Sequence, residues 1–346
     1  MEYFCTYFDS HYLLRGLALY RSLEQHCPSF RLWVLCMDRS CYEALVQLKL
    51  PSVHLIALEE FEADDEKLLS AKKNRSLIEY YFTCSPSLPL FIFATFPEAE
   101  RVTYLDADLF FFENPAPVFE EIADHSVAMI GHRFSPQLKH LESYGIYNVG
   151  WLSFKRDEHA LACLHWWREQ CIAWCYDRVE DGRFADQKYL DTWPSRFARV
   201  VVLRHKGANL APWNISNYNI REQGGRVWVD EQPLIFFHFH GLKKVNAWLY
   251  GHNFALYGIK PSKTILRSIY APYFASFLNV GEALLPFLET SVESSVRYQT
   301  KKPAPSQESH LVYRLLNSLR RPLHVCREIL ARNYLIVVKR YLLVIV

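Results

Sequence analysis

The first 105 residues alternate between two kinds of segment, and this alternation constrains the fold more than any other feature. Short runs rich in β-branched and aromatic residues read as strands, and longer amphipathic segments between them read as helices. Strands are expected at 3–8, 31–37, 53–58 and 102–105, and helices at 13–26, 42–48, 66–84 and 88–96. Such alternation predicts an α/β fold with a mostly parallel sheet, helices on both faces, and a ligand site at the carboxyl ends of the strands.

Two carboxylates interrupt the last of these apolar runs. Asp106 and Asp108 stand one residue apart in a stretch, 102–112, that is otherwise apolar or aromatic. If the whole stretch is a strand, both side chains point to the same side. Two hard oxygen ligands facing one way suit Mg²⁺ or Mn²⁺. The alternative from these residues alone is a strand that ends in an acidic turn.

A second polar interruption follows an apolar run at 234–237. His238 and His240 are followed by Gly241, which permits a tight turn, and then by Lys243 and Lys244. A neutral imidazole is a common ligand of transition metals, and a nearby lysine can neutralise a phosphate as a point charge. A bound nucleotide diphosphate with its metal would account for both, although an isolated histidine here would more often be a core residue.

The segment from His238 to Lys244 resembles the His-x-x-Gly-x-x-Lys signature of glycosyltransferase family 8. The resemblance, which covers about residues 3–250, implies a GT-A fold, a Rossmann-like mostly parallel sheet flanked by helices. It implies that Asp106, Asp108 and His238 hold Mn²⁺ or Mg²⁺, with His240 as the alternative histidine. It also implies that Lys244 contacts the donor diphosphate.

Other segments match the same family pattern in order. Thr6, Tyr7 and Asp9 resemble its site for the nucleotide base and ribose. Tyr80 matches a helix before the Asp-x-Asp segment, and because Phe82 stands where the family has an arginine, Arg75 or Lys73 would replace that donor contact.

The sugar side of the site is implied by two further segments. Asn148 resembles the asparagine that lines the sugar pocket, and an amide can both donate to and accept from a sugar hydroxyl. Asp186 and Gln187 resemble the residues beside the anomeric carbon and are the catalytic candidates. From the residues alone, the Asp186-Gln187 pair equally fits the start of a helix.

The loop 205–214 contains candidates for acceptor binding. Trp213 and Asn214 suit a sugar, because aromatic faces pack on the apolar faces of pyranose rings. An ordinary surface loop with an anchoring tryptophan is the alternative.

Composition and charge limit the function classes. A net charge of +2 gives no case for binding nucleic acid, and nine cysteines without Cys-x-x-Cys pairs indicate reduced thiols in the cytosol. No signal peptide and no transmembrane run is expected. Three parts are predicted, a catalytic domain over 1–290, a linker over 291–310 and a basic amphipathic helical tail over 311–346. Seven basic residues against one acid in this tail favour an anionic membrane surface, and packing on the catalytic domain or another subunit is the alternative.

Taken together, the sequence predicts a metal-dependent glycosyltransferase. It would move a sugar from a nucleotide-diphosphate donor, with UDP-sugars favoured, to a hydroxyl of a glycan or lipid-linked acceptor. Retention of the anomeric configuration is implied by the family, and lipopolysaccharide or other cell-surface glycan synthesis at the cytoplasmic membrane face is the expected setting. The alternatives are a sugar nucleotidyltransferase and a non-catalytic scaffold of a glycan-assembly complex.

Overall fold

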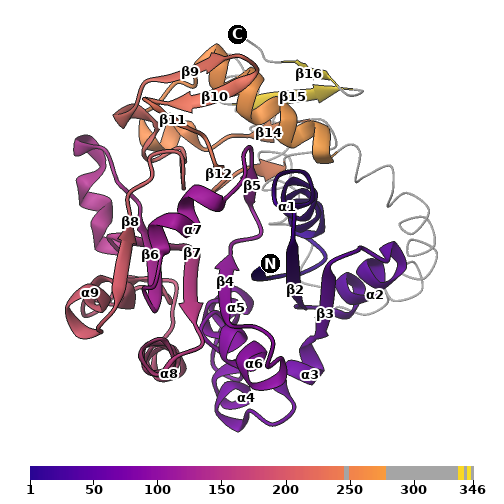
Figure 1. The fold of residues 1–346 in the computed structure, drawn as a ribbon, viewed down its shortest axis with the longest axis vertical. Helices are drawn as coiled ribbons and strands as arrows, with labels where there is room; N and C mark the ends of the chain where they lie inside the picture. Colours follow the sequence, from indigo (N-terminus) through magenta and orange to yellow (C-terminus); the bar gives the residue numbers. More distant parts are fainter. Residues whose placement is uncertain (245–248, 278–333, 339–340, 344–346) are drawn as a thin grey trace, which may run out of the picture. The chain divides into compact units, whose positions relative to one another are not determined.

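A computed structural model of the protein describes residues 1–244, 249–277, 334–338 and 341–343 (Figure 1). The chain divides into two compact units, 1–239 and 240–346. The predicted catalytic domain ends at 290, inside the second unit. The predicted linker at 291–310 lies outside the described residues.

The first unit is built on a seven-stranded sheet, counted over the described residues, with the strand order β3-β2-β1-β4-β7-β6-β8 (Figure 1). Strands β1, β2, β3 and β4 run parallel to one another, and β6 is parallel to β8. Strand β7 lies between these two sets and is antiparallel to both β4 and β6. The predicted mostly parallel α/β sheet is therefore confirmed. The strands are β1 Glu2–Phe8, β2 Phe30–Cys36, β3 Val53–Ala57, β4 Arg101–Leu105, β6 Val127–Gly131, β7 Tyr147–Lys155 and β8 Val200–Leu203.

Helices connect these strands, and polar side chains mark where several of them begin. The Asp38 carboxylate accepts a hydrogen bond from the amide of Cys41 at the start of α2, and Asp157 caps α8 in the same way. The helices are α1 Leu13–His26, α2 Arg39–Leu48, α3 Leu58–Glu62, α4 Glu66–Lys72, α5 Leu77–Cys84, α6 Ser87–Thr95, α7 Ala116–Ile122, α8 Glu158–Ala173 and α9 Trp193–Arg196, with 3₁₀ segments η1 Pro136–Tyr144, η2 Lys188–Thr192 and η3 Ile215–Asn217.

The predicted single helix over 66–84 is wrong, because two helices occupy this range. Ser76 and Glu79 form a capping box, in which each side chain bonds the backbone of the other residue. This arrangement satisfies amide groups that would otherwise lack partners, and so it starts a new helix, α5, after α4 has ended.

Two short strands bring distant parts of the chain together. Strand β5 (Leu109–Phe111) pairs antiparallel with β12 (Phe236–His238), with His238 opposite Leu109. Strand β12 thus begins two residues after the start of the apolar run at 234–237. A separate antiparallel sheet contains β9 Ile220–Gln223, β10 Arg226–Val229 and β11 Gln232–Pro233.

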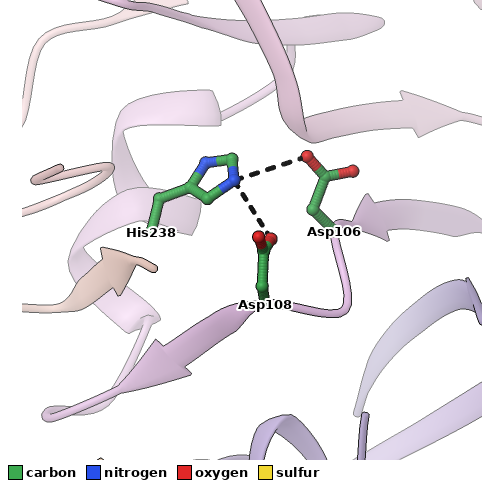
Figure 2. A group of neighbouring side chains, drawn as sticks. All are labelled: Asp106, Asp108 and His238. Carbon is green, nitrogen blue, oxygen red and sulfur yellow. Dashed lines mark ion pairs between the residues drawn. The ribbon is translucent and has the colours of Figure 1, made fainter. Parts of the chain in front are cut away.

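The two carboxylates do not lie in a continuous strand, which corrects the expectation for 102–112. Strand β4 ends at Leu105, β5 starts at Leu109, and a turn between them is closed by a 3.2 Å hydrogen bond from the Leu109 amide to the Asp106 carbonyl. The turn directs the side chains of Asp106 and Asp108 toward His238 (Figure 2). Their convergence comes from the turn and not from the alternation of a strand.

Large aromatic side chains fill the core beneath this turn. Trp151 on β7 stacks on Phe236 of β12 with ring centroids 5.2 Å apart, and both side chains are fully buried. Trp167 on α8 is also fully buried. The cysteines of the described part are free thiols, and all of them are buried.

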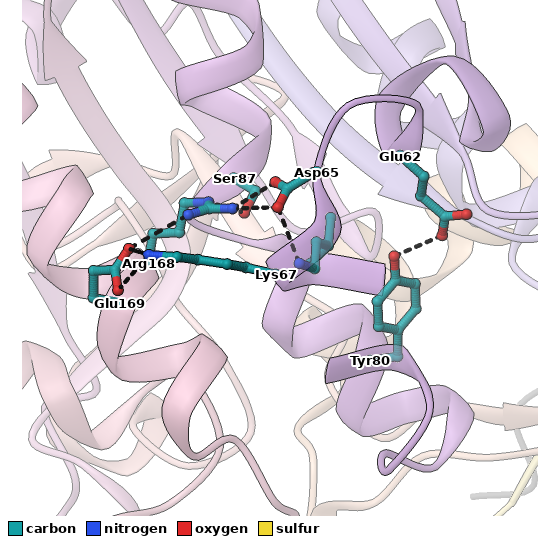
Figure 3. A network of polar contacts seen from close by, with 8 residues as sticks. Glu62, Asp65, Lys67, Tyr80, Ser87, Arg168 and Glu169 are labelled. Carbon is teal, nitrogen blue, oxygen red and sulfur yellow. Dashed lines mark hydrogen bonds and ion pairs between the residues drawn. The ribbon is translucent and has the colours of Figure 1, made fainter. Parts of the chain in front are cut away.

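A polar network joins α4 to α8 on the outside of the sheet (Figure 3). The Arg168 guanidinium donates to both oxygens of Asp65, at 2.6 and 2.5 Å, and to the hydroxyl of Ser87 at 3.2 Å. Asp65 also caps α4, by accepting from the amide of Leu68 at 2.9 Å. One carboxylate therefore fixes both the start of a helix and the contact between two helices.

Replacing Asp65 should destabilise the fold in two separable steps. Asp65→Asn keeps a capping oxygen but loses the charge that pairs with Arg168, whereas Asp65→Ala loses both. We expect Asp65→Ala to lower the free energy of unfolding by about 3 kcal/mol and Asp65→Asn by about half as much. Urea unfolding measures both values. An Asp65→Ala protein as stable as the wild type would contradict the structural role.

The described residues of the second unit form a four-stranded antiparallel sheet with the order β13-β14-β15-β16. Its elements are β13 Lys243–Lys244, β14 Leu249–Gly251, β15 Tyr334–Val338 and β16 Tyr341–Leu343, with η4 Phe254–Tyr257 and the π-helix η5 Ile265–Tyr270.

Strands β15 and β16 correct the prediction of a helix where the tail is described. The segment Tyr334–Val338 is a run of aromatic and branched residues that pairs with β14 and β16, and such residues favour strands. Residues 311–333, with most of the tail's basic side chains, lie outside the described residues. In the part of the chain that the structure describes, no helix has the length and apolar character needed to cross a membrane.

Candidate functional site

Three side chains that the sequence singles out lie together at the end of β4 (Figure 2). His238 Nε2 is 3.1 Å from Asp108 Oδ1 and 3.7 Å from Asp106 Oδ2. One ligand atom from each of the three residues lies within 4.8 Å of the others. This group of described residues includes His238, whereas the alternative ligand, His240, is exposed and belongs to the second unit.

A backbone hydrogen bond to another segment of the chain holds each of these three residues in place. The amide of Asp106 donates to the carbonyl of Gly150 on β7 at 3.1 Å, and the carbonyl of Asp108 accepts from the amide of Phe239 at 3.0 Å. The amide of His238 donates to the carbonyl of Leu210 at 2.8 Å. Strands β4, β5, β7 and β12 and the 205–214 loop thus all contribute to positioning the group.

A tyrosine that the sequence analysis did not select orients one of the carboxylates. The Tyr104 hydroxyl donates to Asp106 Oδ1 at 2.9 Å, and its side chain is buried. Tyr104 lies two residues before Asp106 in the same apolar run, which is the signal that could have identified it. A hydrogen bond of this kind leaves the second oxygen, Oδ2, directed toward His238.

The electrostatics of the group favour a bound cation. Burial raises the pKa of Asp106 to about 6; His238 opposes this shift, and the neighbouring Asp108 adds to it. Burial alone lowers the pKa of His238, but the charge and hydrogen bond of Asp108, together with Asp106, raise it above the ordinary value. Two carboxylates and an imidazole at these distances match the donor set of Mn²⁺ or Mg²⁺, so the residues fit a divalent metal.

Protons and a divalent ion should compete at this group, with a defined dependence on pH. The pKa values of Asp106 and His238 are both raised, so folding favours their protonated forms, and the stability they contribute is lost as the pH rises through those values. A metal needs the deprotonated forms, so its affinity increases over the same range.

We therefore expect Mn²⁺ to raise the melting temperature more at about pH 8 than at about pH 5. Differential scanning fluorimetry with and without the ion measures the two shifts. Equal shifts at both pH values, or a larger shift in acid, would contradict the assignment of these ligands. Asp108→Asn serves as the control for non-specific effects of the ion.

A second polar group surrounds Asn148 on β7. Its Oδ1 accepts from the amide of Gly150 at 3.1 Å, and its Nδ2 lies 3.2 Å from Nε2 of His132 and 3.4 Å from Oε1 of Gln187. The Gln187 amide nitrogen in turn donates to the carbonyl of Tyr144 at 3.0 Å. The structure thus brings together Asn148 and Gln187, which the sequence places on the sugar side, and adds His132.

Asp186 lies close to the carboxylate group from another direction. Its residue is 4% exposed, and its carbonyl accepts from the Trp167 indole at 2.8 Å. Burial raises the pKa of Asp186 to about 7; a hydrogen bond with Ser85 opposes the shift and the charge of Asp106 adds to it. The 3₁₀ segment η2 begins two residues later, with Gln187 at its N-cap position and no capping hydrogen bond from a side chain. The catalytic role of Asp186 stays a prediction.

The predicted nucleotide-binding residues lie at the end of β1. Thr6 is fully buried, and the hydroxyl of Tyr7 is 3.1 Å from that of Ser85. Asp9 accepts from the amides of His11 and Tyr12 and, at 3.2 Å, from the hydroxyl of Tyr81. Their roles in binding a nucleotide stay predictions.

Tyr81 faces this end of the sheet, whereas the predicted Tyr80 does not. The Tyr80 hydroxyl donates to Glu62 at 2.6 Å, a buried contact with α3 (Figure 3). Successive residues of a helix point about 100° apart, so a neighbour in sequence can face the site when the selected residue faces the core. Tyr81 also lies edge-on to Tyr7, with ring centroids 6.2 Å apart.

Three other predicted site residues have contacts that favour structural roles. The guanidinium of Arg75 donates to the hydroxyl of Tyr176 at 2.6 Å and to the carbonyl of Ile172 at 3.2 Å, which ties it to the end of α8. Trp213 and Asn214 are buried, and both donate to the carbonyl of His132 at 2.9 Å. Their contacts favour anchoring of the 205–214 loop over the predicted binding of an acceptor.

The Trp213 ring also packs against the candidate metal group, which consists of Asp106, Asp108 and His238. It lies edge-on to the His238 ring at 5.1 Å, and edge-on to the His132 ring at 5.2 Å.

Lys244, the predicted phosphate contact, belongs to β13 of the second unit, where it pairs with Tyr250. Its contact with a phosphate stays a prediction.

Comparison with solved structures finds glycosyltransferases at low sequence identity. The galactosyltransferase LgtC, crystallised with donor and acceptor sugar analogs, is 16% identical; the match covers 69% of this chain and 87% of LgtC with a TM-score of 0.46. Mouse xyloside xylosyltransferase 1 is 12% identical, with coverage of 69% and 98% and a TM-score of 0.46. A glycosyltransferase involved in glycosylation of the major capsid of PBCV-1 is 12% identical, with coverage of 70% and 93% and a TM-score of 0.41.

Sequence comparison finds nearer relatives in Bacillus subtilis (strain 168). The uncharacterized protein YfnD is 34% identical over 274 residues, which are 78% of this chain and 87% of YfnD. The uncharacterized protein YfnF is 35% identical over 251 residues, which are 70% of this chain and 82% of YfnF. No family model matches the chain. At this identity and coverage, the chain belongs to the protein family of YfnD and YfnF.

Proposed function

We propose that this protein is a metal-dependent glycosyltransferase that uses a nucleotide-diphosphate sugar. The observation that carries the proposal is the convergence of Asp106, Asp108 and His238, from two distant parts of the chain, on one position at the end of β4. Such a donor set suits a divalent cation. The resemblance to glycosyltransferase family 8 implies that this cation binds together with a nucleotide diphosphate. The α/β sheet supports the proposal, because ligands of such sheets bind at the carboxyl ends of strands.

Each residue of the group has a defined part in the proposed reaction. Asp106, Asp108 and His238 would hold Mn²⁺ or Mg²⁺, and Tyr104 would fix the orientation of the Asp106 carboxylate. A divalent ion bound there supplies electrostatic stabilisation for the departing nucleotide diphosphate. Because the ligands come from a turn and a strand that are tied by backbone hydrogen bonds, little reorganisation is needed at the moment of reaction.

The amides and the remaining carboxylate would act on the sugar. Asn148 and Gln187 form one hydrogen-bonded group whose side-chain oxygens have remaining lone pairs that suit sugar hydroxyls. Asp186 lies near enough to Asp106 for their charges to interact, so we place it beside the reacting carbon. The family resemblance supports retention of the anomeric configuration and a UDP-sugar as donor.

The nucleotide would lie at the end of β1. Asp9 is held there by two backbone amides and by Tyr81, and its carboxylate suits the hydroxyls of a ribose. Thr6 and Tyr7 belong to the same strand end. We retain Lys244 as the proposed contact for the diphosphate, on the strength of the family signature alone.

A panel of nucleotides tests the donor. We expect UDP with Mn²⁺ to raise the melting temperature, by mass action, more than either does alone, and slow metal-dependent hydrolysis of a UDP-sugar to accompany it. A preference for GDP or dTDP would change the donor base and keep the function. Binding without any hydrolysis or transfer would favour a non-catalytic scaffold, and release of pyrophosphate from a nucleoside triphosphate with a sugar phosphate would favour a nucleotidyltransferase.

We further propose an acceptor at an anionic membrane surface, because seven basic residues lie within 311–346. Replacing Arg320, Arg321 and Arg327 by glutamate should reduce sedimentation with anionic vesicles. Neutral vesicles are the control, and neither the wild type nor the variant should sediment with them. Equal sedimentation of the variant and the wild type would count against contact with a membrane.

A further inference from the structure

His132 is a buried histidine that the sequence analysis did not select. It follows directly after β6 and is 5% exposed. Its ring stacks on Phe134, with centroids 4.6 Å apart and an angle of 8° between the planes, and it lies edge-on to Trp213. Phe134 stacked on its face and Trp213 packed edge-on restrict the rotation of this buried imidazole, so its two nitrogens face defined partners.

The hydrogen-bond directions around Asn148 can be assigned from the backbone. The amide of Gly150 can only donate, so the atom of Asn148 that faces it must be the oxygen. The Asn148 nitrogen therefore faces Nε2 of His132, and because that nitrogen can only donate, Nε2 must be the accepting, unprotonated atom. The proton of the neutral ring is then on Nδ1, which lies 3.4 Å from the carbonyl of Ile146.

The same reasoning extends to Gln187. Its nitrogen donates to the carbonyl of Tyr144, so its oxygen is the atom that accepts from the second proton of Asn148. Two backbone groups, the Gly150 amide and the Tyr144 carbonyl, thus identify which atom is the oxygen and which the nitrogen in both side-chain amides. His132 completes the assignment because it accepts the first proton of Asn148.

We propose that His132 is a positioning residue: as the neutral Nδ1-protonated tautomer, it locks the Asn148 amide and through it presents the Gln187 oxygen as an acceptor for a hydroxyl of the donor sugar. This inference rests on the proposed function for its ligand, a nucleotide-diphosphate sugar. The tautomer and the amide orientation do not depend on that function. His132 acts through Asn148 and Gln187 and does not itself touch the reacting atoms.

His132 also links the sugar side to the metal group. Its carbonyl accepts from the Trp213 indole, and the Trp213 ring contacts His238. Because this hydrogen bond uses the carbonyl, it persists in a variant with another side chain and keeps Trp213 anchored, whereas the edge-on contact between the two rings is lost. Substitution of the imidazole should therefore affect the sugar side and leave the binding of metal and nucleotide diphosphate unchanged.

Two amide substitutions separate the proposed role from simple packing. In His132→Gln, the side-chain oxygen can occupy the place of Nε2 and accept from Asn148, whereas in His132→Asn the amide reaches only the place of Nδ1. We expect His132→Asn to lower the affinity for a UDP-sugar with Mn²⁺ about 10-fold and the affinity for UDP with Mn²⁺ hardly at all. His132→Gln should restore most of the lost affinity for the sugar nucleotide.

Isothermal titration calorimetry of both variants with UDP and with a UDP-sugar distinguishes the positioning role of His132 from a general loss of structure. Equal losses for UDP and the UDP-sugar in His132→Asn, or no difference between the Asn and Gln variants, would overturn the positioning of the sugar site. Melting temperatures of both variants show whether the fold is retained. A wild-type protein that binds neither ligand would refute the proposed function and the sugar ligand together, and leave the tautomer to be judged by a separate measurement.

That separate measurement is ¹⁵N NMR of the imidazole in the full-length protein without ligands. The His132→Gln variant identifies the His132 signals by their absence. We expect the shifts of a neutral ring with the proton on Nδ1 and an unprotonated Nε2. A proton on Nε2, or an imidazolium at neutral pH, would overturn the assigned direction of the Asn148 hydrogen bond whatever the protein binds.

Discussion

Asp108→Asn should abolish the stabilisation by Mn²⁺ and reduce sugar transfer or UDP-sugar hydrolysis by at least about 10²-fold. The substitution replaces an ionised ligand by a neutral amide of the same shape, so the lost quantity is the charge that faces His238 Nε2 at 3.1 Å. Asp108 repels Asp106 but pairs with His238, so the substitution removes one unfavourable and one favourable interaction, and the stability of the metal-free variant should change little. Thermal shifts with and without Mn²⁺ measure the first effect, and a coupled assay for released UDP measures the second.

Asp64→Asn provides the matched control, because Asp64 is exposed on the surface between α3 and α4. It should keep the full response to Mn²⁺ and full activity. If Asp108→Asn retained the metal response, Asp106, Asp108 and His238 would not be the metal site, and the proposed glycosyl transfer would lose its main support.

Gly150→Ala should disrupt the site although residue 150 carries no functional side chain. A Cβ at this position would lie 2.6 Å from Asn148 Oδ1 and 3.0 Å from Cε1 and Nδ1 of His238. One of these side chains must therefore move, and both belong to the site. We expect a loss of about 10-fold or more in affinity for Mn²⁺, and a decrease of about 2 kcal/mol in the free energy of unfolding from overpacking.

Gly131→Ala is the control for this prediction. Gly131 is also a buried strand glycine, the last residue of β6, but a Cβ there would meet its nearest atom, Arg133 Cγ, at 3.6 Å, an ordinary contact. Isothermal titration with Mn²⁺ and urea unfolding should show little change in Gly131→Ala. Equal behaviour of the two variants would show that the close approach at Gly150 does not control the site.

The sequence predicts the α/β architecture well, because strands and helices here are set by local patterns. The apolar runs that form β1, β2 and β4 are short and flanked by polar residues, and the amphipathic segment of α1 has its observed bounds. Boundaries set by hydrogen bonds of a few side chains are predicted less well. The break between α4 and α5 depends on the reciprocal bonds of Ser76 and Glu79, which a hydrophobic pattern does not reveal.

The tail shows the limit of reading charge as a signal for a helix. The excess of basic residues, with apolar residues between them, suggested an amphipathic helical tail, but Tyr334–Val338 pairs as a strand with β14 and β16. Strand pairing depends on partners that are distant in sequence, so composition within the segment cannot determine it.

By itself, the sequence identifies candidate metal ligands: two carboxylates and a histidine stand where apolar strands end, and these residue types are ligands of divalent cations in proteins. Tertiary structure decides which residues share the site. The pairing of β5 with β12 brings His238 to the two carboxylates, the rotation along α5 places Tyr81 and not Tyr80 beside Asp9, and the buried contacts of Trp213 and Asn214 favour structural roles. Local chemistry is encoded by residue type, whereas proximity and exposure arise from backbone pairing between segments far apart in the chain.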